Sequence, residues 1–375
     1  MDRWRSLRPL WSLAGQPALF GGRDRVRHLH SLASERVALP ALRFGAAFLE
    51  RMAVREVPEA GAWRAEGYES VSPALFAVDD ALVHSAPGLL AVGGYVSPDS
   101  LDHTDPARHG YERQGYAVKL RASAVEEVPG VAVNLLAGGC GNVQHWLCSA
   151  VGRLGAVPAD RLAEASVVLI PAEVSAVQRR LLDAMPLPPG MAVRAVGDGE
   201  TLRVRRLLVP TSVSAEFRYH PCLRDTLRRA LDRHPPDPGL PRRFYVDRRG
   251  AAARRLVNED DLAAQLARQG IVPVALERLT LHQQVALFRS AELIVAPHGA
   301  GLANLVFAPP GCRVVEVLMD SYATWCFRNL AGLCGLDYDC VIGRTVGRWA
   351  ELGPAVHGSA WTVSVPHVLA AAVPG

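Results

Sequence analysis

A short turn with two glycines, His298-Gly299-Ala300-Gly301, is the part of the chain whose residue types best fit a ligand-binding role. It lies between two apolar runs, Leu293–Ala296 and Val314–Leu318, which have the length and composition of buried parallel strands. Leu302–Phe307 reads as a helix. The glycines let a ligand approach the backbone closely, and the helix N-terminus offers unpaired N–H groups to an anion. This strand, turn, helix and strand therefore predict phosphate binding.

Arginine side chains precede this unit at positions suited to a phosphate. Arg248 is expected at the carboxyl end of a strand at Arg243–Asp247, where ligands bind in open α/β sheets. Arg254 and its neighbour Arg255 come just before a helix that Asn258 is expected to cap. Without Mg²⁺, a leaving diphosphate is stabilised by arginines and a helix N-terminus. These three arginines are the candidate phosphate ligands.

Other polar residues of this half have two interpretations each. His298 donates either to a phosphate or sugar hydroxyl, which we favour, or to a neighbouring carbonyl. Gln284 and Asn304 contact a base or sugar, or else form a hydrogen bond between helices. Glu316 lies in an apolar strand, where an unpaired carboxylate is costly to bury. It therefore pairs with an arginine or accepts ribose hydroxyls, and we favour the ligand.

A second constellation lies in the first half of the chain. Gly138-Gly139-Cys140-Gly141 is a turn, and Asn142 is a good N-cap for a helix predicted to run to Leu154. His145 falls in the first turn of that helix, beside Trp146. A helix N-terminus favours the neutral imidazole, which is the form that a general base requires. His145 is therefore the candidate base.

Bulk properties indicate a soluble globular protein. With 375 residues, two domains are expected, and 49% apolar with 21% charged residues is an ordinary globular composition. The net charge is +4, Lys119 is the only lysine, and no basic stripe interleaved with aromatics predicts nucleic-acid binding. Seven cysteines without a CxxC pair predict reduced thiols, no metal site and a cytoplasmic protein. Arginines and tryptophans near the N-terminus are compatible with a peripheral contact with the inner membrane face, but we favour an ordinary frayed N-terminus.

Alternating elements predict two α/β domains, residues 1–213 and 214–375, and leave open that the last helix packs back on the first. A β-rich edge is expected at Ser72–Val96 and a helix at Ala41–Val54. In the second domain, Thr280 with Gln283 predicts a capping box at the start of a helix. Further strands are expected at Gly130–Ala137, Ala165–Pro171, Arg206–Pro210 and Ile271–Leu276, and further helices at Ser175–Met185 and His220–Arg233.

Several motifs, in order, resemble those of glycosyltransferase family sixty-one. The densest is His298-Gly299-Ala300-Gly301-Leu302-Ala303-Asn304. The others are Asn142-Val143-Gln144-His145-Trp146-Leu147, Tyr245-Val246-Asp247-Arg248, Arg254-Arg255-Leu256-Val257-Asn258-Glu259, Gln284, Phe307, Pro310-Gly311 and Glu316.

The resemblance implies an α/β, GT-B-like fold with two Rossmann-like doubly wound domains facing a cleft. It implies inverting transfer of a hexosyl or pentosyl group from a nucleotide sugar to a glycan or lipid-linked glycan acceptor. No metal or cofactor is expected, and the expected setting is surface polysaccharide biosynthesis. His145 would be catalytic, Asn142 and Trp146 would face the acceptor, and the donor-binding residues would be Arg248, Arg254, Arg255, Gln284, His298, Gly299, Ala300, Gly301, Asn304 and Glu316.

The chain departs from the family pattern at four places. Two of them are Gly152, where many members carry a proline, and Val143, where they carry an aromatic residue. Ser149 stands where many members carry an acid, and Asp247 stands where a serine is usual. If the family's base is that acid, Asp79 or Asp80 is the alternative here.

Two rival functions remain. An NAD(P)-dependent oxidoreductase is disfavoured because Asn304 replaces the third glycine of its motif and Glu316 comes too early for the ribose contact. A decayed sugar-nucleotide-binding or scaffold protein gains weight from Ser149. Asp337-Tyr338-Asp339 has the form of a metal-binding Asp-x-Asp, but it follows the glycine unit, so we interpret it as a turn or surface strand.

Overall fold

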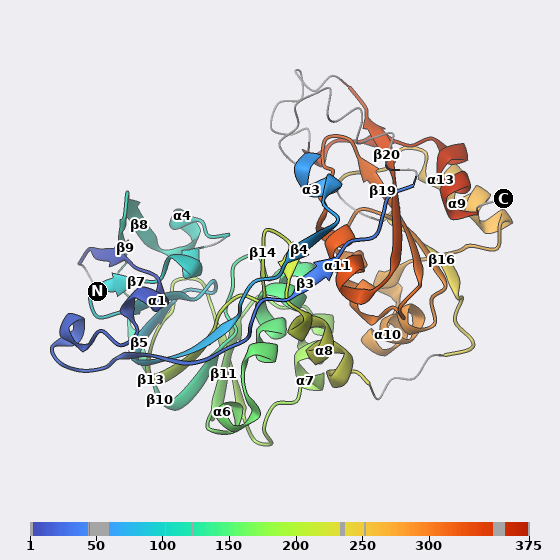
Figure 1. Cartoon of the computed structure of the whole chain (residues 1–375). Helices are drawn as coiled ribbons and strands as arrows, with labels where there is room; N and C mark the ends of the chain where they lie inside the picture. The colour runs from blue at the N-terminus through green and yellow to red at the C-terminus, as the bar shows by residue number, and fades with distance from the viewer. Residues whose placement is uncertain are drawn as a thin grey trace. The chain divides into compact units, whose positions relative to one another are not determined.

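The computed structural model describes residues 3–43, 45, 60–101, 103–121, 123–232, 237–250, 253–347 and 357–373 (Figure 1). It confirms the predicted α/β class. The chain divides into two compact units, and both are discontinuous. The first unit contains residues up to 35, 71–215 and 220–226, and the second contains 36–70, 216–219 and 227 onward. A division into two continuous domains after residue 213 stays a prediction.

The first unit is built on a mixed sheet of eleven strands. Four neighbours, in the order β12-β11-β10-β13, are parallel, and β5 then pairs antiparallel with β13. The sheet is therefore not wholly parallel as a doubly wound sheet would be, because residues 74–96 fold as antiparallel hairpins. In sheet order the strands are β12 (Ala192–Val196), β11 (Val167–Pro171), β10 (Val125–Asn134), β13 (Thr201–Pro210), β5 (Ala74–His84), β6 (Leu89–Val92), β7 (Tyr95–Val96), β1 (Arg5–Leu7), β9 (Ala117–Leu120) and β8 (Tyr111–Gln114), with β2 (Val26–Ser31) beside β5.

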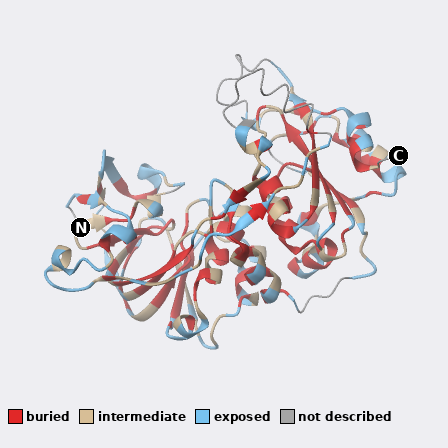
Figure 2. Cartoon of the chain, in the orientation of Figure 1, coloured by how far each residue is buried: buried red, intermediate tan, exposed pale blue. Residues whose placement is uncertain are grey.

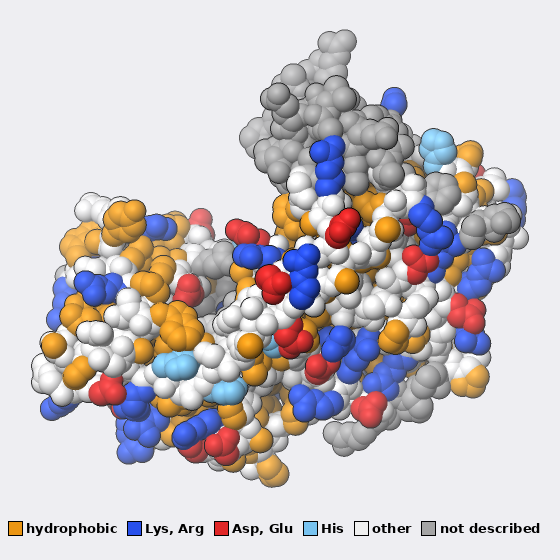
Figure 3. All heavy atoms as spheres, viewed as in Figure 1, with side chains coloured by type: hydrophobic (Ala, Val, Ile, Leu, Met, Phe, Trp, Pro, Cys, Tyr) orange, Lys and Arg blue, Asp and Glu red, His pale blue; other side chains and the backbone are white. Residues whose placement is uncertain are grey.

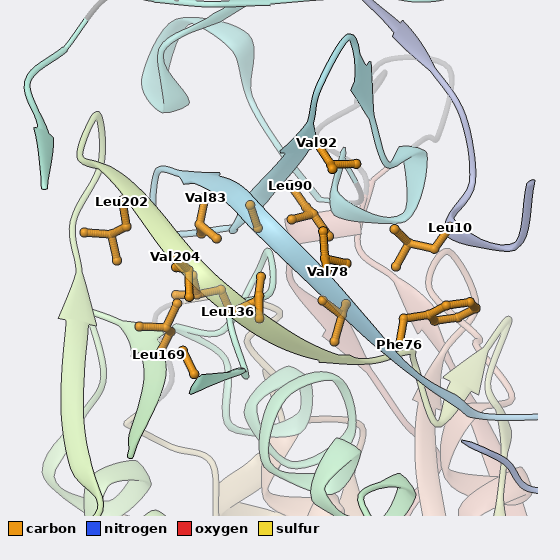
Figure 4. Packing of buried hydrophobic residues seen from close by; sticks show 14 of the residues in the cluster. Leu10, Phe76, Val78, Val83, Leu90, Val92, Leu136, Leu169, Leu202 and Val204 are labelled. Atoms are coloured by element: carbon orange, nitrogen blue, oxygen red, sulfur yellow. The ribbon is translucent and has the colours of Figure 1, made fainter. Parts of the chain in front are cut away.

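Apolar side chains from these strands form one core. Phe76 and Val78 of β5 lie in the same cluster as Leu202 and Val204 of β13, and Leu169 of β11 joins them (Figure 4). All five are fully buried. Since burial of one such side chain contributes about 1.5–3 kcal/mol, this cluster supplies much of the stability of the first unit.

The second unit is built on a sheet of six strands. Five are parallel, and the short β21 pairs antiparallel with β20. The chain passes from β16 to β17 on one side and then returns to β18 on the other side of β16. The carboxyl ends of β16 and β18 therefore form a topological switch point, where α/β sheets bind ligands. The strands in sheet order are β17 (Val272–Val274), β16 (Arg243–Val246), β18 (Leu293–Pro297), β19 (Arg313–Met319), β20 (Asp337–Thr345) and β21 (Trp361–Thr362).

Helices cover both faces of this second sheet, and its central strands β16, β18 and β19 are almost wholly buried (Figure 2). Helices α9 (Glu259–Arg268) and α13 (Val365–Ala372) share a core with Tyr245 and other residues of one face. Phe244 points to the opposite face and packs on Phe288 of α10 (Leu281–Arg289), with ring centroids 5.3 Å apart. The last helix, α13, thus packs on α9, β19 and β20 of its own unit.

A buried arginine joins the early segment 36–70 to the rest of the second unit. Arg328, on α11 (Cys326–Cys334), is 3% exposed. Its guanidinium donates to the carbonyl oxygens of Pro40 at 2.9 Å, Trp63 at 2.6 Å and Ala65 at 3.1 Å. Hydrogen bonds to a charged group contribute about 1.5–3 kcal/mol each, so Arg328 holds this segment firmly.

Some local elements differ from the predictions. The helix expected from Asn142 to Leu154 is a turn of α-helix, α5 (Val143–His145), followed by a π-helical turn, η3 (Trp146–Ala150), and a 3₁₀ segment, η4 (Val151–Ala156). The helix after the glycine turn is also 3₁₀, η6 (Ala300–Phe307). Asp337-Tyr338-Asp339 begins a strand, as one of the two interpretations predicted; Asp337 is partly exposed, but Tyr338 is 0% and Asp339 2% exposed, so the strand turns inward from the surface. The helix expected at Ala41–Val54 falls mostly outside the described residues.

The remaining elements are short. They are α1 (Leu10–Leu13), η1 (Pro17–Phe20), β3 (Arg36–Ala38), α3 (Ala60–Arg64), β4 (Gly67–Glu69), η2 (Pro98–Leu101), α4 (Pro106–His109), α6 (Ala159–Ala163), α7 (Ala176–Ala184), β14 (Ser214–Ala215), β15 (Arg218–Tyr219), α8 (Pro221–Ala230) and η5 (Leu276–Arg278).

The described residues also show the distribution of surface charge, the state of the cysteines and the lengths of the helices. Positive and negative side chains are interspersed over the face drawn in Figure 3. All seven cysteines are free, and burial raises the pKa of Cys140 to about 11. Within the described residues, no helix has the length and apolar character needed to cross a membrane.

Candidate functional site

The loop after β16 is held by a buried glutamate. Oε1 of Glu259 accepts the backbone N–H of Arg248 at 2.7 Å and the hydroxyl of Tyr245 at 2.9 Å. Glu259 is 4% exposed, and burial raises its pKa. This carboxyl group fixes the point where the chain leaves the strand, and so fixes the start of the Arg248 side chain.

Arg248 reaches across the switch point to the turn after β18. Its guanidinium donates to the carbonyl of His298 and lies directly on Gly299. A Cβ at residue 299 would lie 2.9–3.0 Å from the Cζ, Nε and Nη1 atoms of Arg248. The backbone of Gly299 is extended, so glycine is needed here for close approach and not for its conformational freedom. Gly301 is crowded in the same way, because a Cβ there would lie 2.8 Å from Leu276 Cδ1.

A second arginine stands beside the first. Arg254 has a left-handed backbone, with φ +54°, and its guanidinium lies over the ring of Tyr322, 4.8 Å from the centroid. Burial lowers the pKa of Arg248, and the nearby charge of Arg254 lowers it further. Within the described residues, neither guanidinium forms an ion pair with a carboxylate, and Nε of Arg254 is buried without a hydrogen-bond partner. Two guanidinium groups without an ion-pair partner at a switch point are suited to an anion with several oxygens.

His298 is the third member of this group, and its ring is held tightly. Nδ1 lies 2.6 Å from Oε1 of Glu316, and the other carboxylate oxygen accepts the hydroxyl of Tyr338 at 2.5 Å. The imidazole also packs on the rings of Tyr322 and Phe327, with centroids 5.3 and 5.1 Å away. Both expectations for Glu316 are therefore wrong: it pairs with a histidine and a tyrosine, and at 0% exposure it cannot reach a ligand.

Of five other predicted residues, three have structural partners, namely Asn304, Gln284 and Asn258. Asn304, 4% exposed, donates to Gln284 at 3.1 Å, and Gln284 donates to the carbonyl of Leu276 at 3.0 Å. For this pair the structure favours the hydrogen bond between helices. Arg255 is exposed, and Ala300 begins η6 next to the crowded glycine. The Asn258 side chain does not cap α9; it bonds instead to residues 362 and 363 of the chain's last segment.

The first unit has its own switch point, after β10. Asn142 caps α5 as predicted, since its side chain accepts the N–H of Gln144 at 2.8 Å. Trp146 is 0% exposed, and its indole N–H donates to the carbonyl of Gln178 at 3.0 Å. The indole therefore anchors the helical segment, and its burial contradicts a direct contact with an acceptor. His145, in contrast, is only partly buried.

His145 lies between a glycine and a second histidine. Gly139 is left-handed, with φ +73°, and a Cβ there would lie 3.4 Å from the imidazole of His145. The ring of His103 meets the ring of His145 edge to face, with centroids 4.7 Å apart. His103 also has a left-handed backbone, with φ +52°, and such strain in a non-glycine residue is common at functional sites.

The alternative acids, Asp79 and Asp80, are both engaged. Asp79 pairs with Arg27 at 2.7 Å and Arg206 at 2.9 Å, and Asp80 pairs with Arg25 at 3.0 Å. Burial acts to raise the pKa of Asp79, but hydrogen bonds from the two arginines lower it below its ordinary value. A carboxylate so stabilised is a weak base, which leaves His145 as the better candidate in the first unit.

Sequence reasoning missed the side chains that position the others. Tyr322 and His103 belong to no motif, and Tyr338 and Glu259 were noted only as members of motifs, without a role of their own. A signal existed for Tyr322, which follows the carboxyl end of β19 and so lies at the ligand edge of the sheet. Nothing in the sequence indicates which side chains pair with the buried carboxylates of Glu259 and Glu316, because those partners come from other elements of the fold.

Comparison with known proteins finds a family model that matches part of this site. The family model described as glycosyltransferase 61 matches residues 143–315, a stretch that holds Arg248, Arg254 and His298. An EGF domain-specific O-linked N-acetylglucosamine transferase of Drosophila melanogaster is 34% identical over 97 residues, covering 25% of this chain and 18% of that protein.

Two further relatives match over similar lengths. A beta-1,2-xylosyltransferase of Oryza sativa subsp. japonica is 34% identical over 119 residues, covering 30% of this chain and 21% of its own. A protein O-linked-mannose beta-1,4-N-acetylglucosaminyltransferase 2 of Mus musculus is 34% identical over 103 residues, covering 25% and 17%. The match thus spans no more than 21% of any of these three relatives.

Proposed function

We propose that this chain, whose residues 143–315 form a glycosyltransferase family 61 domain, transfers a sugar from a nucleotide-sugar donor to a glycan acceptor. The observation that carries the proposal is the pair of arginines, Arg248 and Arg254, beside His298 at the switch point of the second sheet. A nucleotide sugar supplies the anion that such a group would bind, because its diphosphate has several oxygens.

In the proposed reaction, an acceptor hydroxyl attacks the anomeric carbon as the bond from that carbon to the diphosphate oxygen breaks. The bonding electron pair goes to the diphosphate, and the configuration at the anomeric carbon inverts. Arg248 and Arg254 stabilise the charge that develops on the leaving group, so that no metal is needed for this role. Such preorganised positive charge acts mainly on the transition state, where the negative charge is largest.

The proton of the acceptor hydroxyl requires a base. His145 is the proposed base, because its imidazole is partly exposed and sits at the N-terminal end of a helical segment. We propose a GT-B-like arrangement in which the second unit binds the donor and the first supplies His145 and binds the acceptor. Asn142 would support the acceptor side through its cap, and Trp146 through packing alone.

The names of the relatives narrow the first donors and acceptors to test. They describe N-acetylglucosamine and xylose transfer, so UDP-GlcNAc and UDP-xylose are the first donors. We propose a glycan or lipid-linked glycan acceptor in surface polysaccharide assembly, in a cytoplasmic protein that contacts the membrane peripherally.

A donor screen tests the proposal. Thermal stability is measured with UDP-, GDP-, CMP- and dTDP-sugars and with NAD and NADP, each with and without EDTA. A ligand at 100 times its Kd stabilises the folded state by about 2.7 kcal/mol, which shifts the melting temperature measurably. At least one nucleotide sugar should stabilise the protein, and EDTA should leave the shift unchanged. Stabilisation by NAD or NADP alone would overturn the proposal.

Arg248→Ala and Arg249→Ala form a matched pair for the same screen. Arg249 is the next residue, but it is exposed and paired with Asp247 and Asp260. Arg248→Ala should abolish the shift that the donor causes, and Arg249→Ala should keep it. Circular dichroism of both variants checks that the fold is intact.

A further inference from the structure

A buried chain of polar side chains runs through three neighbouring strands of the second sheet to the imidazole of His298. Glu316 lies within β19, opposite Cys340 of β20, and Tyr338 comes from the same neighbouring strand. His298 follows β18 on the other side. Glu316 and Tyr338 are both 0% exposed and lie beyond the residues that the family model matches. A fully buried carboxylate must be paired, and here two partners share it.

The direction of each hydrogen bond follows from the protonation of Tyr338. Burial raises the pKa of this phenol well above its ordinary value, so the hydroxyl keeps its proton and donates it to one oxygen of Glu316. The other oxygen, 2.6 Å from Nδ1, then accepts the Nδ1–H of His298. A carboxylate on one ring nitrogen fixes the tautomer and the orientation of a histidine, as it does in catalytic triads.

The free edge of the imidazole is therefore Nε2, which has no partner among the described residues. The ring cannot turn, because Tyr322 and Phe327 pack on it and the backbone N–H of His298 bonds to Val317 at 2.9 Å. His298 remains 7% exposed, and Arg248 lies on its carbonyl.

With the proton on Nδ1, a neutral imidazole presents a lone pair at Nε2, which would repel a phosphate oxygen. The imidazolium presents Nε2–H, and its charge is balanced by the buried Glu316. A bound diphosphate adds negative charge on the other side of the ring. It also balances the positive charges of Arg248 and Arg254, which would otherwise disfavour a positive charge on the imidazole. Ligand binding should therefore draw a second proton onto the imidazole.

We propose that Glu316 is a positioning residue that, held by Tyr338, makes His298 take up a proton and donate Nε2–H when the diphosphate of a nucleotide binds. The idea rests on the proposed function and adds a proton to its binding step. The proton comes from the solvent, and no covalent bond to carbon or phosphorus changes.

Other groups around the imidazole do not supply this proton uptake. Arg248 and Arg254 are already charged, and a tyrosine such as Tyr322 does not gain a proton near neutral pH. Burial raises the pKa values of Tyr338 and Cys340, so both stay neutral. His357 is the remaining histidine here; it is exposed, it bonds to the carbonyl of Ser321 at 2.6 Å, and its ring meets that of Tyr322. It is therefore the matched control.

Isothermal titration calorimetry tests the proposal on the full chain. UDP, GDP and dTDP are titrated at about pH 8, where the terminal phosphate of each nucleotide has already lost its proton. Two buffers with different ionisation enthalpies are used, and the difference in heat gives the protons taken up. The wild type should take up a substantial fraction of one proton per bound nucleotide, and His357→Gln should take up the same. His298→Gln and Glu316→Gln should bind about tenfold more weakly, a loss of about 1.4 kcal/mol, and should take up none.

A second variant and a spectroscopic measurement keep the test decisive if Glu316→Gln folds poorly. Tyr338→Phe keeps the carboxylate, so it should keep the uptake at reduced affinity. Nitrogen-15 NMR of the histidines should show one imidazole with its proton on Nδ1 that becomes doubly protonated with UDP. Nucleotide binding without proton uptake overturns the role proposed for Glu316 and His298 and leaves the proposed function standing. If none of the three nucleotides binds, both fall.

Discussion

The two units place different chemistry at equivalent topological positions. In the first sheet, β10 lies between β11 and β13, and the loop after β10 leads to Asn142 and His145. In the second sheet, the corresponding switch point between β16 and β18 carries Arg248, Arg254 and His298. Both edges are the carboxyl ends of parallel strands, where an α/β sheet presents its loops to ligands.

The side chains at these two edges are held in different ways. In the second unit, Arg248 presses on a glycine, and His298 is bonded to a fully buried carboxylate. In the first unit, His145 is partly exposed and meets an exposed His103. Rigid charge suits an anion whose position must not vary, whereas an accessible imidazole suits a proton acceptor. This difference agrees with the proposed function, in which the edge of the second sheet binds the leaving group and the edge of the first sheet takes the proton.

The largest effect should come from His145, at the ligand edge of the first sheet. His145→Ala should lower kcat about 10²–10⁴-fold, the usual contribution of a general base, with the donor Kd unchanged. Steady-state kinetics and calorimetry measure the two quantities. His28→Ala is the control, because His28 is an exposed histidine on β2 of the same unit. An unchanged kcat in His145→Ala would remove the distinction between the two edges.

The next effect separates two adjacent arginines at the second edge. Arg254→Ala should weaken donor binding about 10–100-fold, since a hydrogen bond to a charged group contributes about 1.5–3 kcal/mol. Arg255→Ala should leave the Kd within about twofold, because Arg255 is exposed and surface substitutions are usually small. Calorimetric titration of both variants makes the comparison. Equal losses would show that the anion is not held where Arg254 meets Tyr322.

A smaller change should come from the glycine under Arg248. Gly299→Ala would place a methyl group 2.9–3.0 Å from the guanidinium, which must then move. Such overpacking costs about 1–3 kcal/mol, and we expect roughly tenfold weaker donor binding with kcat less affected. Gly250→Ala is the control, since its Cβ would meet only Glu277, at 3.7 Å. If Gly299→Ala binds the donor normally, the contact between Arg248 and the turn is not needed for binding.

The smallest effect concerns stability against pH. Glu259 has a pKa raised by burial in the folded state, so its contribution to the free energy of unfolding is fully present below its unfolded pKa and is lost as pH rises through the folded pKa. Glu259→Gln keeps an oxygen for Arg248 and Tyr245 and removes this titration. Urea unfolding at pH values from about 4 to 7 should show a smaller fall in stability for Glu259→Gln than for the wild type. Parallel curves would show that Glu259 does not titrate in this range.

Features encoded by neighbouring residues could be predicted from the sequence. Thr280 and Gln283 form the expected capping box, and Asn142 caps its helix, because both need only residues two or three positions away. The buried strands of both sheets were visible as apolar runs. The glycine turn was also visible, although the reason for Gly299, a guanidinium fifty residues earlier in the chain, was not.

Features that depend on distant residues could not be predicted. Asn258 has the sequence context of a cap, but its amide bonds to residues more than a hundred positions later. The choice between Arg254 and Arg255 depends on a left-handed backbone and on Tyr322, neither of which leaves a local pattern. Glu316 pairs with His298 and Tyr338 because three strands lie side by side, and strand order is not a local property.

The bonds from Arg328 to the early segment have a consequence for synthesis of the protein. Trp63 leaves the ribosome 265 residues before the arginine that binds its carbonyl. At about 5–20 residues per second, this segment waits roughly 15–50 s for its partner. The entire first unit is synthesised before Arg328 and can fold in that time. Until Arg328 is made, the segment that carries the large side chain of Trp63 must avoid aggregation without this partner. Chaperone binding during translation should therefore concentrate on residues 36–70.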